Sequence, residues 1–329
     1  MISPPRLNHG YLFQISTAMS LVPVSDIYYD LSLAPPQFWQ HVRSDGGDIR
    51  IFDRLGIPCP RQVTGFDKVG NKGSLYLKVG NGAPYSIAYG NTSLLEPSPS
   101  DPLGSYHVWE ASAKGIYHLE DQYDSTSNQH NGTLSVPPPS SVTAKIKDGY
   151  EWPSDSLHEE FINMGDVPDF NFTSGFTLHC WCYILSDAGF APVDSALMSK
   201  ITDVPYLGYM MWKKQVTSNI QLYINSSSRI ASPNLPALAW HHLVATWDGT
   251  TLNFYTNSVP ATPVSYGVAP ASSGRPFQIG QYLTDGLAYT ILDEVRVYSR
   301  ALSSAEVGVM FSNQDNPASF WITGPEMLS

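Results

Sequence analysis

The stretch WHHLVATWDGTTLNFYTNS, from Trp240 to Ser258, decides the fold class. Apolar and polar side chains alternate on both sides of Asp248-Gly249, and this is the period of a β-strand rather than of a helix. An Asp-Gly pair between two such runs is a strong signal for a tight turn. The stretch therefore predicts two antiparallel strands joined at Asp248-Gly249.

Further alternating runs predict strands along the whole chain. They are IYYDLSLAP (27–35), DIRIFD (48–53), SLYLKV (74–79), YSIAYGN (85–91), FTLHCWCYIL (176–185), IQLYIN (220–225) and ILDEVRVY (291–298). After the last run, Ser303 and Glu306 have the spacing of a capping box and predict one short helix. The 25 Gly and 26 Pro residues suit short strands joined by turns. The predicted fold class is all-β, with two β-sandwich domains.

The Ser- and Pro-rich segment NTSLLEPSPSDPLGS (91–105) is typical of a linker between domains. It divides the chain into an N-terminal β-sandwich over residues 1–104 and a second domain over 105–312. Residues 313–329 form a tail that is expected to pack back on the body, because burying Phe320 and Trp321 would anchor it.

Charge and cysteine content exclude several classes of protein. The 18 basic and 29 acidic side chains give a net charge of −11, which offers no basic patch for nucleic acid. The first 25 residues lack the pattern of a secretory signal, and no apolar run is long enough for a membrane helix, so no membrane insertion is expected. Cys59, Cys180 and Cys182 are expected to be buried, reduced thiols rather than a disulfide framework.

Four segments of the second domain resemble laminin-G-like, concanavalin A-like jelly rolls. They are YHLEDQYDSTSNQHNGTL (117–134), FTLHCWCYI (176–184), WHHLVATWDGTTLNFYTNS (240–258) and ILDEVRVYSRALSSAEV (291–307), in the order that this family shows. The resemblance implies that the second domain is such a jelly roll. The segment FWQHVRSDGGDIRIFD (38–53), with SLYLKV and YSIAYGN, resembles a domain of unknown function that accompanies such jelly rolls in bacterial and phage proteins.

A calcium site is the first candidate that the resemblance implies, since jelly rolls of this type often hold a structural calcium. Its candidate ligands are Asp124 and Asn128 of the Asp/Ser/Asn loop and Asp293 of the last strand, because calcium takes oxygen ligands. The alternative is a loop of Asx turns in which these side chains bond backbone N–H groups.

Catalytic and histidine metal sites are not expected. Concanavalin-like hydrolases need two carboxylates on one strand face, whereas Asp293 and Glu294 are neighbours and are expected to point to opposite faces. His241 and His242 are likewise neighbours, so one is expected in the core and the other at the surface. The sequence therefore predicts no enzyme and no catalytic or cofactor-binding residue.

Aromatic side chains are the candidates for binding glycans, because sugar rings stack on exposed aromatic faces. The candidates are Tyr206, Tyr209, Trp212, Tyr223 and Tyr282. The alternative for each is a place in the core or in a protein interface.

The expected function is that of a non-enzymatic virion structural protein, a phage tail or capsid decoration component with a lectin-like domain that contacts host surface polysaccharide. Its expected partners are other virion structural proteins in an oligomeric assembly, and its location is the virion. A phage protein needs no export signal, which fits the start of this sequence. The alternative is a bacterial cell-surface or secreted carbohydrate-binding adhesion module.

Overall fold

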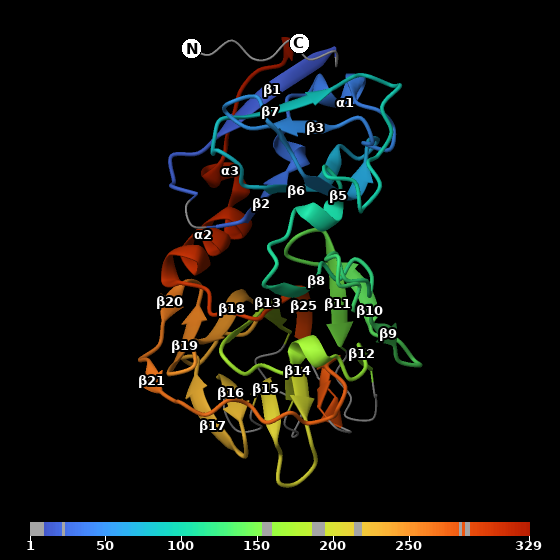
Figure 1. The fold of residues 1–329 in the computed structure, drawn as a ribbon. Coiled ribbons are helices and arrows are strands. Elements are labelled where there is room, and N and C mark those ends of the chain that lie inside the picture. The colour runs from blue at the N-terminus through green and yellow to red at the C-terminus, as the bar shows by residue number, and fades with distance from the viewer. Residues whose placement is uncertain are drawn as a thin grey trace. The chain divides into compact units, whose positions relative to one another are not determined.

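The computed structural model of this chain describes residues 10–21, 24–152, 160–185, 195–213, 219–282, 285–286 and 290–329. Antiparallel sheets make up most of the regular structure in these ranges, so the all-β prediction is confirmed. The chain divides into two compact units, residues 1–110 with 308–329 and residues 111–307 (Figure 1). The domain limits at 104/105 and 312/313 stay predictions. Within the described ranges, no helix has both the length and the apolar character to cross a bilayer.

The first unit contains two antiparallel sheets. One has the strand order β26-β1-β7-β3-β4, with β27 also paired to β1, and the other has the order β2-β6-β5. The strands are β1 (Tyr11–Ser16), β2 (Asp26–Asp30), β3 (Arg50–Phe52), β4 (Pro58–Cys59), β5 (Arg61–Asp67), β6 (Lys72–Lys78), β7 (Tyr85–Tyr89), β26 (Ile322–Thr323) and β27 (Met327–Leu328), and the short helices are α1 (Phe38–His41) and α3 (Pro317–Phe320). Both sheets contribute to one core, with Phe13 and Ile87 from the first and Leu75 from the second.

Residues 308–329 complete this first unit, although the second unit precedes them in the sequence. Strand β26 pairs with β1, where Thr323 lies opposite Ile15. The indole N–H of Trp321 donates to the backbone oxygen of Tyr28 at 2.8 Å, and Phe320 is also buried. The two large aromatic side chains therefore fix the end of the chain to the core of this unit.

The second unit contains two large sheets. The β13 sheet has the order β10-β11-β25-β13-β18-β19-β20, with β8 paired to β25 and β21 to β19, and the β15 sheet has the order β17-β16-β15-β14-β22-β12-β9. Strands of the β13 sheet are β8 (Ala113–Tyr117), β10 (Ser140–Thr143), β11 (Asp148–Trp152), β13 (Phe176–Ile184), β18 (Trp240–Trp247), β19 (Thr251–Thr256), β20 (Val259–Pro260), β21 (Val264–Ser265) and β25 (Thr290–Tyr298). Strands of the β15 sheet are β9 (Thr133–Leu134), β12 (Ile162–Asn163), β14 (Ser195–Ile201), β15 (Gly208–Lys213), β16 (Ile220–Ile224), β17 (Ser227–Ala231) and β22 (Gln278–Ile279), while β23 (Gln281–Tyr282) pairs with β24 (Asp285–Gly286).

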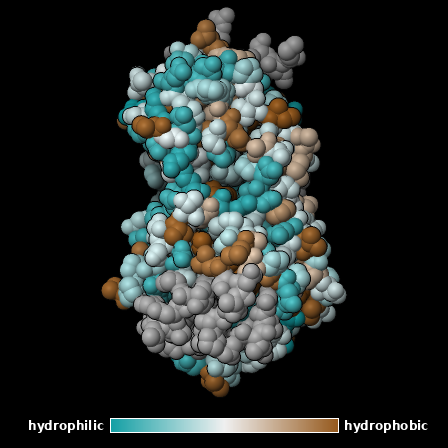
Figure 2. Space-filling view, turned by 180° about the vertical axis from the view of Figure 1, so that it is seen from behind, coloured by the Kyte–Doolittle hydropathy of each residue, from teal (hydrophilic) through white to brown (hydrophobic). Residues whose placement is uncertain are grey.

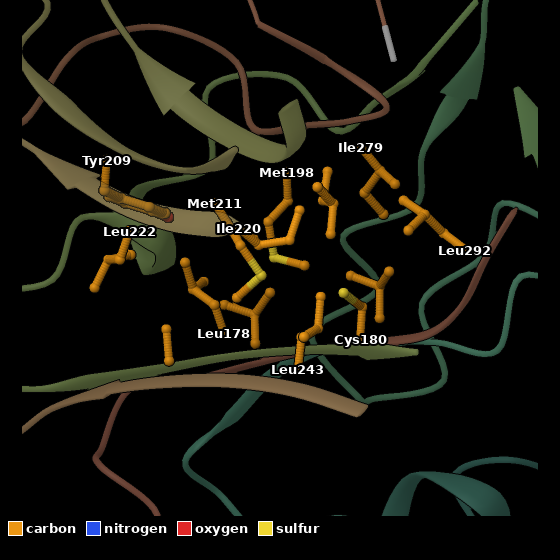
Figure 3. Close-up of a cluster of buried hydrophobic side chains, with 14 of the residues drawn as sticks. Leu178, Cys180, Met198, Tyr209, Met211, Ile220, Leu222, Leu243, Ile279 and Leu292 are labelled. Carbon is orange, nitrogen blue, oxygen red and sulfur yellow. The ribbon is translucent and has the colours of Figure 1, made fainter. Parts of the chain in front are cut away.

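The core of the second unit lies between these two sheets. In Figure 3, Met198, Met211 and Leu222 of the β15 sheet face Leu178 and Leu243 of the β13 sheet. The same core holds Cys180 and Cys182 as free thiols on one face of β13, and Cys59 is buried in the first unit. The prediction that all three cysteines are buried is confirmed.

The two clearest local signals of the sequence are present. Strands β18 and β19 are joined at Asp248-Gly249, where Asp248 Oδ1 accepts hydrogen bonds from the backbone N–H groups of Thr250 and Thr251 at 2.9 and 2.7 Å. Helix α2 (Ser304–Asp315) begins at the predicted capping box. The N–H of Ser303 donates to Glu306 Oε2 at 2.7 Å, and the N–H of Glu306 donates to Ser303 Oγ at 3.3 Å.

Candidate functional site

Asp124, in the loop after β8, is buried and its carboxylate is fully used within the protein. Oδ1 accepts from the backbone N–H groups of Ile116 and Thr126 at 3.0 and 2.9 Å. Oδ2 accepts from the Thr126 hydroxyl at 2.8 Å and from the N–H of His130 at 3.0 Å. Burial raises the pKa of Asp124, and these hydrogen bonds oppose that rise. The carboxylate holds the loop together as an Asx-type hydrogen-bonding centre.

The other two candidate calcium ligands do not complete a cation site with Asp124. The side-chain amide of Asn128 donates to the backbone oxygen of Ala113 at 3.1 Å, and therefore presents a donor rather than an oxygen there. Asp293 Oδ2 accepts from the N–H of Ile146 at 2.6 Å, on a different loop. Among the described residues, no group of three or more His, Cys, Asp or Glu side chains is arranged to hold a metal ion. Calcium at this place stays a prediction, and the donor set does not fit it.

A β-bulge changes the directions of Asp293 and Glu294. The register of β13 against β25 shifts between His179 and Trp181, and Glu294 has a φ of 51°. Leu292 and Val295 both point into the core, so the two residues between them share the outer face of the sheet. The prediction that Asp293 and Glu294 point to opposite faces is wrong, because it assumed a regular strand.

Both carboxyl groups at this bulge are nevertheless completely buried. Glu294 Oε2 accepts from the Arg296 guanidinium at 2.7 Å, and Oε1 lies 2.6 Å from Nδ1 of His118. Burial and the neighbouring Glu294 raise the pKa of Asp293 well above its ordinary value. A completely buried carboxyl group does not present itself to a substrate, and Glu294 is in addition held by Arg296 and His118.

Two buried histidines lie beside this bulge and form a defined hydrogen-bonded pair. Nδ1 of His179 lies 2.8 Å from the Glu294 backbone oxygen, which can only accept, so Nδ1 carries the proton. Nε2 of the neutral His179 ring then accepts from Nε2–H of His242 at 2.9 Å. Burial lowers the pKa of His179 to about 3 and that of His242 well below its ordinary value. Both rings are therefore neutral at pH 7.

The expectation that His241 or His242 lies at the surface is wrong. His241 is 4 % exposed and bonds the Pro236 backbone oxygen through Nε2 at 2.8 Å, and His242 is completely buried. The two side chains do lie on opposite faces of β18, but each face is covered at this point.

Tyr209 is a core residue and cannot stack on a sugar. Its hydroxyl donates to the backbone oxygen of Phe170 at 3.0 Å, and its ring packs against Phe172 and Phe176. The glycan candidate Tyr209 is therefore corrected to a structural residue. The backbone of Tyr282 lies in β23, but its side chain falls outside the part of the chain that the structure describes.

Three of the aromatic candidates meet on the outer face of the β15 sheet. Tyr223 alternates with the core residues of β16, and its ring lies 5.8 Å from Trp212 and 6.5 Å from Tyr206. Tyr206 is 36 % exposed and Tyr223 is half-buried, whereas Trp212 is 7 % exposed and supports the other two. We call the rings of Tyr206 and Tyr223 the tyrosine platform.

Backbone hydrogen bonds between two neighbouring turns place Tyr206 in this platform. Tyr206 has a φ of 55° in the turn that joins β14 to β15, where its N–H donates to the Asp203 oxygen at 2.8 Å. Its own backbone oxygen accepts from the N–H of Ser226, in the turn between β16 and β17, at 3.0 Å. The two turns are therefore tied together, and their aromatic side chains lie close to each other.

Polar side chains that the sequence analysis did not single out lie beside the platform. Ser228 is opposite Tyr223 across the strand pair, and its hydroxyl donates to the side-chain oxygen of Gln221 at 2.5 Å. The alternation of β16 was the available signal, because it puts Gln221 on the same face as Tyr223. Rings with amide and hydroxyl groups at their edge can hold a polyhydroxylated ligand by stacking and hydrogen bonding.

Comparison with known families supports the fold of the second unit. Residues 160–308 match the model of the concanavalin A-like lectin/glucanases superfamily. The two packed antiparallel sheets of the second unit agree with the jelly-roll fold that this model describes. Comparison with curated proteins gives no significant match.

Solved structures resemble the chain at low identity, which shows the fold alone. The binding domain of Paraclostridial Mosquitocidal Protein 1 has a TM-score of 0.50 and 17 % identity over 61 % of this chain and 52 % of that one, so this chain covers only about half of it. Domain 4 of AbnA, a GH43 extracellular arabinanase from Geobacillus stearothermophilus, has a TM-score of 0.49 and 17 % identity over 61 % of this chain and 100 % of that one. The binding domain of botulinum neurotoxin serotype G has a TM-score of 0.47 and 13 % identity over 61 % of this chain and 51 % of that one.

Proposed function

We propose that this protein binds carbohydrate without catalysis, and that the tyrosine platform of its jelly roll is the binding site. The observation that carries the proposal is the platform itself, two exposed or half-exposed rings beside Gln221 and Ser228 on a lectin-like fold. The ligand class is a glycan, since the C–H faces of sugar rings stack on tyrosine and their hydroxyls bond amides. The domain in the structure of AbnA is in complex with arabinotriose, which is a sugar ligand on a similarly built domain.

Binding of soluble polysaccharides tests this proposal. We expect the double variant Tyr206→Ala/Tyr223→Ala to lose affinity about tenfold or more, because each stacked ring contributes about 1 kcal/mol. Tyr123→Ala is the matched control, because Tyr123 is 54 % exposed and lies in a different loop. Equal affinity of the double variant and wild type, measured by titration calorimetry, would exclude the platform as the site.

The absence of catalysis is part of the proposal. It is supported by the complete burial of Asp293 and Glu294, which share one sheet face, and by the pairing of Glu294 with Arg296. Incubation with the polysaccharides that bind, followed by analysis of reducing ends, should show no products. Turnover that disappears in Glu294→Gln would refute this part.

We further propose that the protein is a virion component, a phage tail or capsid decoration protein that assembles with other virion proteins as an oligomer. The three free, buried cysteines support assembly in a reducing cytoplasm. Mass spectrometry of purified particles tests the location. A chain that is absent from virions but present on a bacterial surface would replace this role by that of an adhesion module.

A further inference from the structure

The outer face of the β13 sheet, opposite the sheet of the tyrosine platform, carries a row of side chains that can contact a ligand. In register across four strands lie Glu151 of β11, Ile291 of β25, Tyr183 of β13 and Trp240 of β18. Neighbouring strands lie about 4.8 Å apart, so this row spans roughly 14 Å. We call Glu151, Tyr183 and Trp240 the cross-strand row.

The side chains of the cross-strand row point away from the core. Tyr150 and Trp152 flank Glu151 and both belong to the core, so the carboxylate lies on the opposite face. Cys182 and Ile184 flank Tyr183 in the same way. All three side chains of the row are half-buried rather than covered.

The carboxylate of Glu151, the hydroxyl of Tyr183 and the indole N–H of Trp240 make no hydrogen bond with any residue that the structure describes. The rings of Tyr183 and Trp240 lie 5.4 Å apart at an angle of 60°, so together they offer two apolar surfaces of different direction. Two donors, one acceptor and two ring surfaces therefore converge on one strip of the sheet.

The strip is bordered by the turn between β10 and β11. The N–H of Ala144 donates to the backbone oxygen of Lys147 at 2.7 Å, which closes this turn. The Lys145 ammonium lies 4.5 Å from the ring centroid of Trp181, in the adjacent row of the sheet. This contact holds the turn over the sheet and limits the strip on that side.

We propose that the cross-strand row is a second glycan site, and that its ligand is a neutral polysaccharide chain. The inference rests on the proposed carbohydrate-binding function and adds a site on the opposite sheet. The carboxylate of Glu151 accepts hydrogen bonds from sugar hydroxyls and repels acidic sugars, as does the net charge of −11. Two sites on one jelly roll let a single chain bind two segments of a polymer, which raises the retention on a polysaccharide surface.

Two double variants separate this inference from the proposed function. The probes are laminarin, dextran and linear arabinan as neutral polysaccharides and alginate as an acidic one, with short oligosaccharides of the best binder for calorimetry. We expect two sites per chain in the wild type and one in either Tyr183→Ala/Trp240→Ala or Tyr206→Ala/Tyr223→Ala. Retention on the immobilised polymer should fall by about 10²-fold in each, because bivalent attachment is lost.

A second variant guards against misfolding as the cause. Glu151→Gln keeps the shape of a half-buried side chain, and we expect it to weaken the oligosaccharide binding that persists in Tyr206→Ala/Tyr223→Ala by several-fold. Unchanged stoichiometry in Tyr183→Ala/Trp240→Ala would overturn the cross-strand row while leaving the platform in place. Unchanged stoichiometry in the platform variant alone would overturn the proposed function of the platform and leave the row as the glycan site. Binding of alginate in preference to all neutral probes would overturn the ligand class.

Discussion

Acidification should destabilise the second unit through the His179–His242 pair. The folded-state pKa of His179 is about 3, against 6.5 for the ordinary group, and the pKa of His242 is lowered in the same direction. As the pH falls below 6.5, these two histidines are protonated in the unfolded chain but stay neutral in the folded chain. Stability from this source is therefore complete above pH 6.5 and is lost progressively down to about pH 3.

The size of the effect follows from the distance to the ordinary pKa. At pH 5, which is 1.5 units below the ordinary pKa, His179 is protonated in the unfolded chain but not in the folded one. At about 1.4 kcal/mol per pH unit, this lowers the free energy of unfolding by about 2 kcal/mol. The lowered pKa of His242 adds to this loss in the same direction, and 2 kcal/mol is already a large part of the stability of an ordinary domain. Asp293 acts in the opposite direction, because its raised pKa makes the folded state bind a proton first.

A comparison of variants isolates the histidine contribution from that of Asp293. Guanidinium unfolding at pH 8 and pH 5, followed by tryptophan fluorescence, gives the change in unfolding free energy for each protein. We expect the loss between the two pH values to be smaller by about 2 kcal/mol or more in His179→Gln/His242→Gln than in wild type. His130→Gln is the control, since this half-buried ring bonds Asp169 away from the pair. Equal losses in wild type and the double variant would refute the reasoning.

Three further predictions concern side-chain packing within each unit and the candidate calcium site. Trp321→Ala should cost about 3–5 kcal/mol of unfolding free energy, because it removes a buried ring that anchors the tail, and a cost below 1 kcal/mol in denaturant titration would contradict that role. Gly280→Ala should destabilise far more than Gly274→Ala, since both have a positive φ but only at Gly280 would a Cβ lie 2.3 Å from Trp152 Nε1; equal melting temperatures would contradict this. EDTA should leave the melting temperature unchanged, because Asp124 is already saturated by four donors; a fall in calorimetry that calcium reverses would restore the calcium site.

Local signals in the sequence were sufficient for most of the strands of the jelly roll. The predicted strand at 176–185 is β13, and the Asp248-Gly249 hairpin joins β18 to β19. These predictions succeed because alternation and turn chemistry are properties of short segments. The capping box at Ser303 succeeds for the same reason.

The failures lie where a side chain's direction depends on tertiary structure. No glycine in the sequence indicates the bulge at Glu294. Regular alternation therefore predicted opposite sheet faces for Asp293 and Glu294, although both lie on the outer face. The run YMMW (209–212) is apolar on both faces, and the sequence therefore does not say which residues of β15 point inward. Tyr209 was consequently grouped with Tyr223, although one lies in the core and the other on the outer face.

Half-exposed rings with polar groups beside them distinguish the candidate sites from the covered parts of the same sheet faces. On the outer face of the β13 sheet, His179 and Glu294 bond within the protein and are covered, so that region serves stability. On the same face, the donors of Tyr183 and Trp240 have no partner among the described residues, and their rings are half-exposed. On the face drawn in Figure 2, hydrophobic residues lie among hydrophilic ones, and exposed apolar residues do not by themselves mark a site. An unbonded donor gains most from a ligand that brings its own acceptors, so at the cross-strand row a polyhydroxylated ligand would gain new hydrogen bonds in addition to stacking. At the tyrosine platform, where Gln221 and Ser228 already bond each other, the rings supply mainly a stacking surface.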